Sequence, residues 1–546
     1  MKRSVLFVLA SCLALSAFTG CGDSSSPSVA ETSKTETQPA AAGGETGEAV
    51  RDEIIIANRE MISSCSYMNQ SGGLPYCLTN DPLLYVDSEG NYQPHLCDSF
   101  EYSEDGKLMT IHLPEDLYFY DGTNVTANDW KRSFEFGLEH SSMADSWSAI
   151  TSVEADGYDI LIHMDNGFSS TIPFQLASVM LPVVCAEDID NLSEDDMYWG
   201  ARVYGSYYVD ELVQGDHLTL KANPYYKTNN PNIRNQGKPY VDKVTVRFMT
   251  DTFAIVQGLK AGEIDIANSY LTVENLGELN AAENLTVTVA EGAGVRSIIL
   301  NPEAEVFSDE RVRKGMAYLI DREMLSENSD GTIYPCYSLI SETAIGYSKK
   351  FEQWYKDNYT KENNIEEAQK LFAEAGWTDT DGDGYLDKDG KKFEFTLTEF
   401  SHESNLLNLL QIQFMEAGIQ MNIAPVTNTG ELNDVLRNKK YDAALPSNSF
   451  AEVSSILSGQ IERAEIAGLF SETELAEVKD LFKKGQTCMD PDEAEDYFNQ
   501  VQTRFIETTR WIPVSTNCVI TVYNNEIVDG VYYRRDAEKI WLNDVK

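Results

Sequence analysis

A short run of aspartates and glycines is the strongest candidate metal site in this 546-residue sequence. Residues 379–387 read DTDGDGYLD, which places carboxylates at loop positions 1, 3, 5 and 9 and glycine at position 6. Oxygen ligands in this spacing suit Ca²⁺, but position 12 carries Gly390 instead of a bidentate glutamate. We therefore predict an acidic hairpin turn before a strand at Phe393. The calcium alternative is carried by Asp379, Asp381, Asp383 and Asp387.

The sequence lacks the motifs of common nucleophilic and nucleotide-hydrolysing enzymes. Neither GxSxG, which builds a nucleophile elbow, nor GxxxxGK[ST], which cradles phosphates, occurs. His402–Glu403 begins like the zinc motif HExxH, but Leu406 stands where the second histidine is needed. We predict a protein that is not an enzyme and needs no cofactor. A secreted hydrolase with two acids in a cleft is the less favoured alternative.

The N-terminal segment is predicted to be a targeting signal. Lys2 and Arg3 precede a mostly apolar run, residues 5–18, which is too short to cross a bilayer comfortably. Thr19–Gly20–Cys21 resembles a lipoprotein processing site, which implies cleavage before Cys21 and lipid on that cysteine. An ordinary signal peptide with an incidental cysteine is the alternative. Residues 21–50 have few large apolar side chains and should form a flexible tether.

Charge limits the partners of this chain. It has 88 acidic and 42 basic residues, a formal net charge of −46. Phosphate backbones and anionic headgroups would be repelled, which excludes nucleic acid and leaves the lipid on Cys21 as the membrane contact. Apolar residues make up 42% of the chain, enough for a real core.

Local patterns predict a mixed α/β fold. Lys243–Phe248 alternates apolar and polar residues, which is typical of a half-buried strand. Ser308 is followed by two acids, which predicts a helix N-cap there. The following apolar residues, among them Val312 and Met316, recur at helical spacing.

Ordered blocks along the chain resemble the extracellular solute-binding proteins of family 5, the oligopeptide and dipeptide class that serves ATP-binding-cassette importers. The blocks contain HLCDSFEYSEDG, LYFYDGTNVTAND, YGSYYVDELVQGD, FSDERVRKGMAYLIDRE, LRNKKYDAAL and WIPV. They lie within Asp81–Tyr85, Pro94–Asp129, Tyr204–Ala267, Leu300–Met324, Glu366–Asp387, Leu406–Asp442 and Thr509–Val514. Their order and spacing carry the resemblance over nearly the whole chain after residue 50.

The resemblance implies an α/β, two-lobed periplasmic-binding-protein-like fold of class II, with an extra subdomain and a hinge between the lobes. A signal peptide at 1–20 and a tether at 21–50 would precede the fold. Lobe I would combine residues 51–75, 190–297 and 512–546, the extra subdomain would be 76–189, and lobe II would be 298–511. The chain would cross between lobes near Ser297 and again near Pro513.

The resemblance also implies a function. We expect a monomeric, membrane-anchored receptor, on the extracellular face of the cell membrane or in the periplasm. It would capture peptides between its lobes, largely through their backbones, and deliver them to the permease and ATPase subunits of an importer. The family also takes nickel complexes, haem, oligosaccharides and opines, so a non-peptide solute is the alternative.

One block departs from the peptide-binding pattern. After Tyr441–Asp442–Ala443, typical relatives continue with Gly-Trp and an Asp that pairs with the free amine of the peptide. Here residues 445–450 read LPSNSF, and the nearest acid is Glu452. The departure puts the oligopeptide assignment in doubt and leaves the binding-protein assignment in place.

Ligand contacts are expected where strands end toward the other lobe, although core or surface placement is an alternative for each position. Arg296 is our preferred anchor for a ligand carboxylate, because a guanidinium can bind that group through two hydrogen bonds. The predicted contacts are Asn58, Arg59, Tyr67, Tyr76, Arg296, Glu399, Phe400, Ser401, Ser447, Asn448, Phe450, Glu452 and Asn517.

Overall fold

The structure is a computed structural model that describes most of the chain after residue 52. All described residues belong to one compact unit, Ala49–Lys546. No helix in this described part is long and apolar enough to cross a membrane. The described residues are 53–59, 77–87, 90–140, 147–164, 166–179, 181–193, 197, 200–233, 235–268, 271–399, 404–448, 451–528, 533–534 and 537–540.

A 12-stranded mixed sheet organises the fold, in the order β17-β16-β18-β12-β20-β11-β1-β10-β9-β8. Two short strands lie off this path, with β13 paired to β20 and β19 paired to β12. The bounds are β1 Glu53–Asn58, β8 Tyr207–Val213, β9 His217–Ala222, β10 Lys243–Phe248, β11 Ile266–Asn268, β12 Leu285–Leu300, β13 Tyr334–Pro335, β16 Glu394–Glu399, β17 Gln420–Pro425, β18 Ala443–Leu445, β19 Ser447–Asn448 and β20 Trp511–Asn524.

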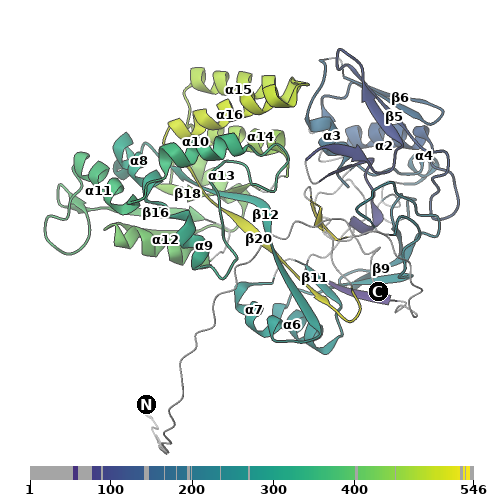
Figure 1. Ribbon diagram of the computed structural model, residues 1–546, viewed down its shortest axis with the longest axis horizontal. Coiled ribbons are helices and arrows are strands. Elements are labelled where there is room, and N and C mark those ends of the chain that lie inside the picture. Colours follow the sequence, from purple (N-terminus) through teal and green to yellow (C-terminus); the bar gives the residue numbers. More distant parts are fainter. Residues whose placement is uncertain are drawn as a thin grey trace, which may run out of the picture. The chain divides into compact units, whose positions relative to one another are not determined.

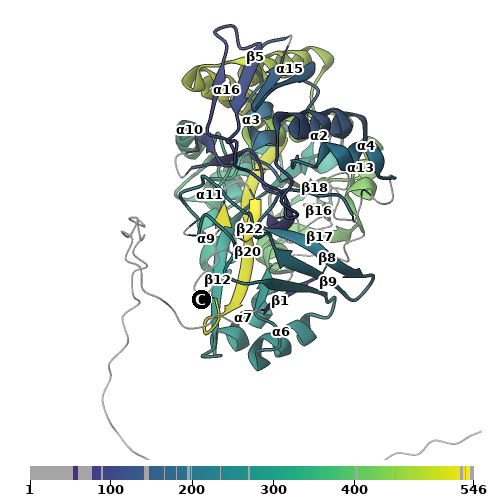
Figure 2. The same ribbon diagram turned by 90° about the vertical axis from the view of Figure 1, so that its right-hand side faces the viewer.

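The two longest strands, β12 and β20, belong to both halves of this sheet. Their antiparallel pairing runs from Leu285↔Asn524 to Ile299↔Trp511, with register shifts between Glu291 and Val295 and between Arg296 and Ser297. β11 pairs with β20 at one end, whereas β18 pairs with β12 at the other. Figures 1 and 2 show the two strands side by side, leading from the helices α8–α16 toward α6 and α7. They form the connection between the two lobes.

Helices cover both faces of the half-sheet that contains β16, β17 and β18 (Figure 1). Alternate β12 residues enter opposite cores, since Ile298 and Leu300 lie in one cluster and Ile299 in the other. The first core is closed by η2 Glu305–Phe307, α8 Glu310–Leu319, α9 Arg322–Glu327, α11 Asn364–Glu374 and α12 Ser404–Glu416. The second is closed by α10 Lys349–Tyr359, α13 Thr429–Arg437, α14 Val453–Ala467, α15 Glu472–Thr487 and α16 Pro491–Glu507.

The other half-sheet is built around β1, which lies between two parallel neighbours, β10 and β11. Its alternate residues again serve two cores, with Ile54 and Ile56 on one face and Ala57 on the other. The helices α6 Thr252–Ala261 and α7 Val273–Asn280 contribute to the core on the Ala57 face. The strand β1 is central in this half-sheet, and its carboxyl-terminal residue is Asn58.

A separate antiparallel sheet forms the extra subdomain. Its strands follow the order β4-β5-β7-β6, and its own hydrophobic cluster includes the fully buried Trp130 and Trp147. The elements are β4 Ser99–Tyr102, β5 Leu108–His112, β6 Ser152–Asp156, β7 Asp159–His163, α2 Ala127–His140, α3 Thr171–Leu176 and α4 Ala186–Asn191. Two further pairs of very short antiparallel strands lie outside these sheets. One joins β2 Leu84–Val86 to β3 Tyr92–Pro94, and the other joins β14 Asp387–Lys388 to β15 Lys391–Lys392. A last hairpin joins β21 Tyr533–Arg534 and β22 Ala537–Ile540.

Two local predictions have different outcomes. The strand Lys243–Phe248 is confirmed with its predicted bounds. The N-cap predicted at Ser308 is wrong, because Asp309 caps α8 by accepting the Arg311 N–H at 2.9 Å. Ser308 instead ends the preceding 3₁₀ turn, where its hydroxyl donates to the Glu305 carbonyl. Serine and aspartate are both good cap residues, so composition alone did not separate them.

Candidate functional site

Arg296 lies in a row of residues that crosses four strands where the halves of the sheet meet. It is the register partner of Ser447 in β19 and of Ser515 in β20, and Ser515 is in turn the partner of Pro335 in β13. Register partners on neighbouring strands share a face of the sheet. Ser447, Arg296 and Ser515 are therefore neighbours, and two of these three were predicted from the sequence.

The polar groups of this row are largely buried. Arg296 is 6% exposed and Ser515 is 1% exposed. The Ser515 hydroxyl has no hydrogen-bond partner among the described residues. A buried hydroxyl without a partner is uncommon in a folded protein, because desolvation then goes uncompensated. The row thus combines a guanidinium with two hydroxyls, a set of donors that suits an anionic oxygen group.

The next row along the strands holds Asn448, Val295, Thr516 and Tyr334. Asn448 is buried, and its amide donates to the Ile456 carbonyl of α14 at 2.9 Å. Thr516 donates its hydroxyl to Glu291 at 2.7 Å. Burial, followed by repulsion from nearby acids, raises the pKa of Glu291 above its usual value. Through Asn448, this row connects β19 to α14.

Asn517 holds the bulge in β12 together. Its side-chain oxygen accepts the Gly294 N–H at 2.8 Å. Gly292 lies so close to Asn517 that an added Cβ would come within 2.7 Å of the same oxygen. Glycine is required there by this close approach rather than by a special backbone angle. Asn517, predicted as a ligand contact, thus has a structural role in the connecting strands.

Glu452 is the N-cap residue of α14. Its two carboxylate oxygens accept the backbone N–H groups of Ser454 and Ser455 at 2.8 and 2.9 Å. The residue is 2% exposed, and this burial raises the pKa of its carboxyl group. Because both oxygens bond to the helix, Glu452 is poorly placed to replace the missing amine-binding acid.

The remaining predicted contacts fall into three groups. Glu399 is buried at the end of β16, beside Leu445 of β18. Asn58 is buried at the end of β1 beside Phe248, and Arg59 follows it as an exposed residue. The other predicted positions lie outside the described residues: Tyr67, Tyr76, Phe400, Ser401, Phe450 and the lipidation candidate Cys21.

Comparison with known protein families matches this architecture. Residues 91–454 fit the family described as bacterial extracellular solute-binding proteins, family 5 Middle. The chain belongs to these family 5 solute-binding proteins. The predicted family is thereby confirmed.

Relatives and solved structures agree with that membership. Oligopeptide-binding protein AppA of Bacillus subtilis is 29% identical over 328 residues, which span 58% of this chain and 57% of the relative. NikA from Brucella suis, solved with Fe(III)-EDTA, has a TM-score of 0.75 at 16% identity and covers 90% of this chain and 99% of its own. AppA of B. subtilis with a nonapeptide has a TM-score of 0.64 at 20% identity, over 90% and 98%. These likenesses confirm the predicted two-lobed fold.

For this family 5 chain, the acidic run after residue 378 forms a surface turn next to the β14–β15 hairpin. Asp379, Asp381 and Asp387 bring carboxylate oxygens within 4.8 Å of one another. Asp379 accepts the N–H groups of Gly382 and Gly384, which closes the turn from within. Asp383, the remaining aspartate of the calcium alternative, is paired with Lys392.

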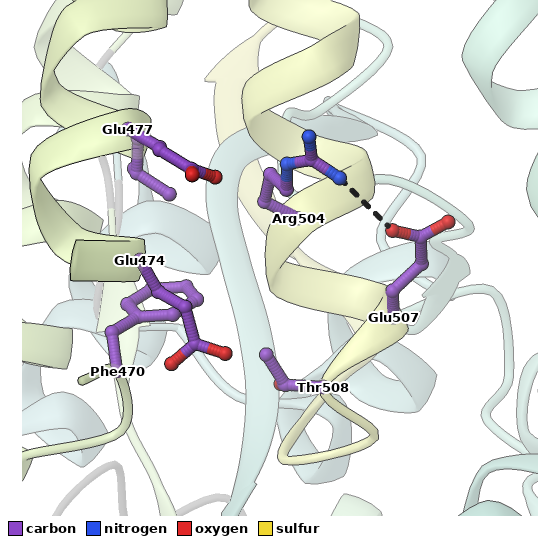
Figure 3. Close-up of a pocket in the computed structure, with 7 residues that line it drawn as sticks. Phe470, Glu474, Glu477, Arg504, Glu507 and Thr508 are labelled. Atoms are coloured by element: carbon purple, nitrogen blue, oxygen red, sulfur yellow. Dashed lines mark ion pairs between the residues drawn. The ribbon is translucent and has the colours of Figure 1, made fainter.

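A pocket of about 280 Å³ lies between α15 and α16 (Figure 3). Figure 3 shows Glu474 and Glu477 facing Arg504 and Glu507 across it, and the last two form an ion pair at 3.6 Å. Glu474 also belongs to the capping box of α15, where it accepts the Ser471 N–H. None of the residues predicted to bind ligand lines this pocket. The sequence also gave no signal for Ser515, which only strand register brings beside Arg296.

Proposed function

We propose that this chain is a receptor that captures a peptide between its lobes and delivers it to an ATP-binding-cassette importer. Membership of the solute-binding family supports the receptor role, and relatives named as oligopeptide-binding proteins support the peptide. The proposal keeps the boundaries predicted from the sequence, with lobe I at 51–75, 190–297 and 512–546, the extra subdomain at 76–189, and lobe II at 298–511. Anchoring through lipid on Cys21, on the outer face of the membrane, belongs to the same proposal.

The observation that carries the proposal is the row formed by Ser447, Arg296 and Ser515. Arg296 and Ser515 lie on β12 and β20, the two strands that run through both halves of the sheet, and Ser447 lies on β19, which pairs with β12. A ligand bound there would touch the elements on which lobe closure depends. A guanidinium flanked by hydroxyls favours a carboxylate, which every unmodified peptide carries at its C-terminus.

A non-peptide anionic solute is the second candidate. It is favoured by the absence of an acid in residues 445–450 and by the role of Glu452 as a helix cap. A buried ammonium without a carboxylate partner is costly to desolvate. Solved structures of the same fold include NikA with Fe(III)-EDTA, a metal chelate rich in carboxylates.

The test begins with native mass spectrometry of the purified protein to find a co-purified solute. Calorimetry then compares peptides that end in a carboxylate with the same peptides ending in an amide. Replacing Arg296 with Ala should lower affinity for the carboxylate form about tenfold or more, and change affinity for the amide much less. The matched control is Arg437→Ala, an exposed arginine of α13 that pairs with Asp434. Equal losses for both peptide forms would contradict the anchor.

A further inference from the structure

A second contact joins the extra subdomain to helices of the other lobe, away from β12 and β20. The hydroxyl of Ser170, the residue before α3, lies 2.6 Å from the hydroxyl of Ser454 in α14. The backbone N–H of Ser170 also donates to the Gln486 carbonyl in α15 at 2.9 Å. Figure 1 shows α3 facing the ends of these helices. Ser170 and Ser454 are 284 residues apart in the sequence, so the contact depends on how the lobes meet.

The contact uses backbone groups that helices leave open at their ends. Gln486 is in the last turn of α15, where carbonyls have no partner within the helix. The N–H of Ser170 sits at the start of α3, where donors are likewise open. The Ser170 N–H and the Gln486 carbonyl form a hydrogen bond with each other when the lobes are in contact, and each can form one with water when the lobes separate. A bond of this kind can therefore form and break at low net cost.

Apolar residues border the hydrogen bonds. Ile345 precedes α10, yet it belongs to the hydrophobic cluster of the extra subdomain and is 8% exposed. It is fixed to the start of α14, since its carbonyl accepts the N–H of Val453, the first residue of that helix, at 2.9 Å, and its own N–H donates to the Ala451 carbonyl just before the helix at 2.9 Å. The sulfur of Met489 lies 3.0 Å from the position that a Cβ on Gly106 would occupy. Ile345 and Met489 thus add apolar contacts beside the hydrogen bonds.

Glu452 fixes the position of Ser454 in this contact. Its carboxylate accepts the Ser454 N–H at 2.8 Å, which sets the first turn of α14 opposite Ser170. The neighbours Ser169 and Ser455 do not reach across. The Ser169 hydroxyl bonds to Thr171, and that of Ser455 bonds to Glu452. The chain therefore provides matched controls one residue away on each side.

We propose that Ser170, Ser454 and Gln486 form a latch that stabilises the closed arrangement of the two lobes in the absence of ligand. Interfaces between domains of one chain are generally small enough to allow relative motion, so a few specific contacts set the balance between open and closed forms. The latch goes beyond the proposed function, because it acts whatever solute is carried. Its tests use the ligand-free protein, so failure to find a ligand would leave them intact.

The first test measures the balance between open and closed forms by double electron–electron resonance, with one spin label on each lobe. Ser170→Ala and Ser454→Ala should each shift ligand-free protein toward the open form by about three- to tenfold, as expected for one neutral hydrogen bond. The double variant should shift no further than either single variant, because both changes remove the same bond. Ser169→Ala and Ser455→Ala should leave the distances unchanged. An unchanged distribution in the Ser170 and Ser454 variants would overturn the latch.

The second test uses a cross-link. Ser170→Cys combined with Ser454→Cys should form a disulfide under mild oxidation of the ligand-free protein, since the two hydroxyls are in contact. Peptide mass spectrometry identifies the bond, and each single cysteine variant controls for reactions with native thiols. Thermal unfolding checks that every variant is folded. A double-cysteine variant that folds but does not cross-link would overturn the proposed contact.

Discussion

Arg322 of α9 donates a hydrogen bond from Nε to the carbonyl oxygen of Pro513 at 3.0 Å. Pro513 is the register partner of Ser297, so Arg322 binds the connecting strands at the point where the chain was predicted to cross between lobes. The same guanidinium donates to the carbonyls of Ile320 and Cys336 and to the hydroxyl of Tyr355. It is 2% exposed and its described hydrogen bonds all go to neutral acceptors.

Replacing Arg322 with Lys should lower the free energy of unfolding by about 3 kcal/mol, because several buried acceptors lose their donor. An ammonium cannot reproduce the planar fork, nor the contact of the guanidinium with the rings of Tyr337 and Tyr355, whose centroids lie 5.1 and 5.0 Å away. Urea unfolding measures the change.

The control for this prediction is Arg311→Lys. Arg311 is an exposed arginine of α8 that pairs with Asp309, and it should cost less than about 1 kcal/mol. Equal losses for the two variants would show that the network around Arg322 contributes no more than a surface ion pair.

The burial and hydrogen bonds of Arg322 could not be predicted from the sequence, whereas some local elements could. The strand Lys243–Phe248 was predictable because its alternation is local. The bonding partners of Arg322 at positions 336, 355 and 513 are distant in the sequence, and nothing near Arg322 indicates burial. The sequence blocks that resemble family 5 predicted the fold class, because most of their residues have structural roles in that fold.

The candidate site was predictable only in part, for a similar reason. Arg296 was chosen because it lies at a predicted lobe crossing, and Ser447 because it follows a predicted strand; the register makes them neighbours. Ser515 was missed because strand register cannot be derived from one strand alone. The role of Glu452 was also missed, since a glutamate is an uncommon cap and the start of α14 was not foreseen.

The stability of the protein should depend on pH through Glu452. Burial raises the pKa of this carboxyl above its usual value of 4.5. The folded state therefore holds the proton more tightly than the unfolded state does, and the associated stability is present in full below about pH 4.5. It is lost as pH rises through the folded pKa. Glu452→Gln should thus gain stability relative to the unaltered protein as pH rises from 4 to 8, measured by urea unfolding.

Glu431→Gln provides a comparison of opposite sign. Hydrogen bonds from the backbone and hydroxyl of Thr427 lower the pKa of Glu431. Its stabilising contribution is present above the unfolded pKa and is lost as pH falls through the folded pKa. The Glu431 variant should therefore be less stable than the unaltered protein near pH 7, and the difference should disappear near pH 3. The same pH trend in both variants would contradict the assignment to Glu452.

Membrane attachment is expected to require Cys21. The segment before it, residues 5–18, is a short apolar run, and residues 21–50 have the composition of a tether. Replacing Cys21 with Ser should move the full chain from the detergent phase to the aqueous phase in a detergent-partitioning assay. Replacing Cys12 with Ser, a cysteine within the apolar run, is the control and should leave partitioning unchanged. A Cys21 variant that stays in the detergent phase would refute lipid attachment at this residue.

A bound peptide is expected not to depend on its free amine. Residues 445–450 contain no acid, and both carboxylate oxygens of Glu452 bond to the start of α14. Calorimetry with free and N-acetylated versions of one peptide should give affinities within about threefold of each other, since no buried carboxylate–ammonium contact is lost. Glu399, buried beside Leu445, is the acid that could make the prediction fail. A loss of about 2 kcal/mol on acetylation, reproduced with the free peptide by Glu399→Gln but not by Glu431→Gln, would show that Glu399 binds the amine instead.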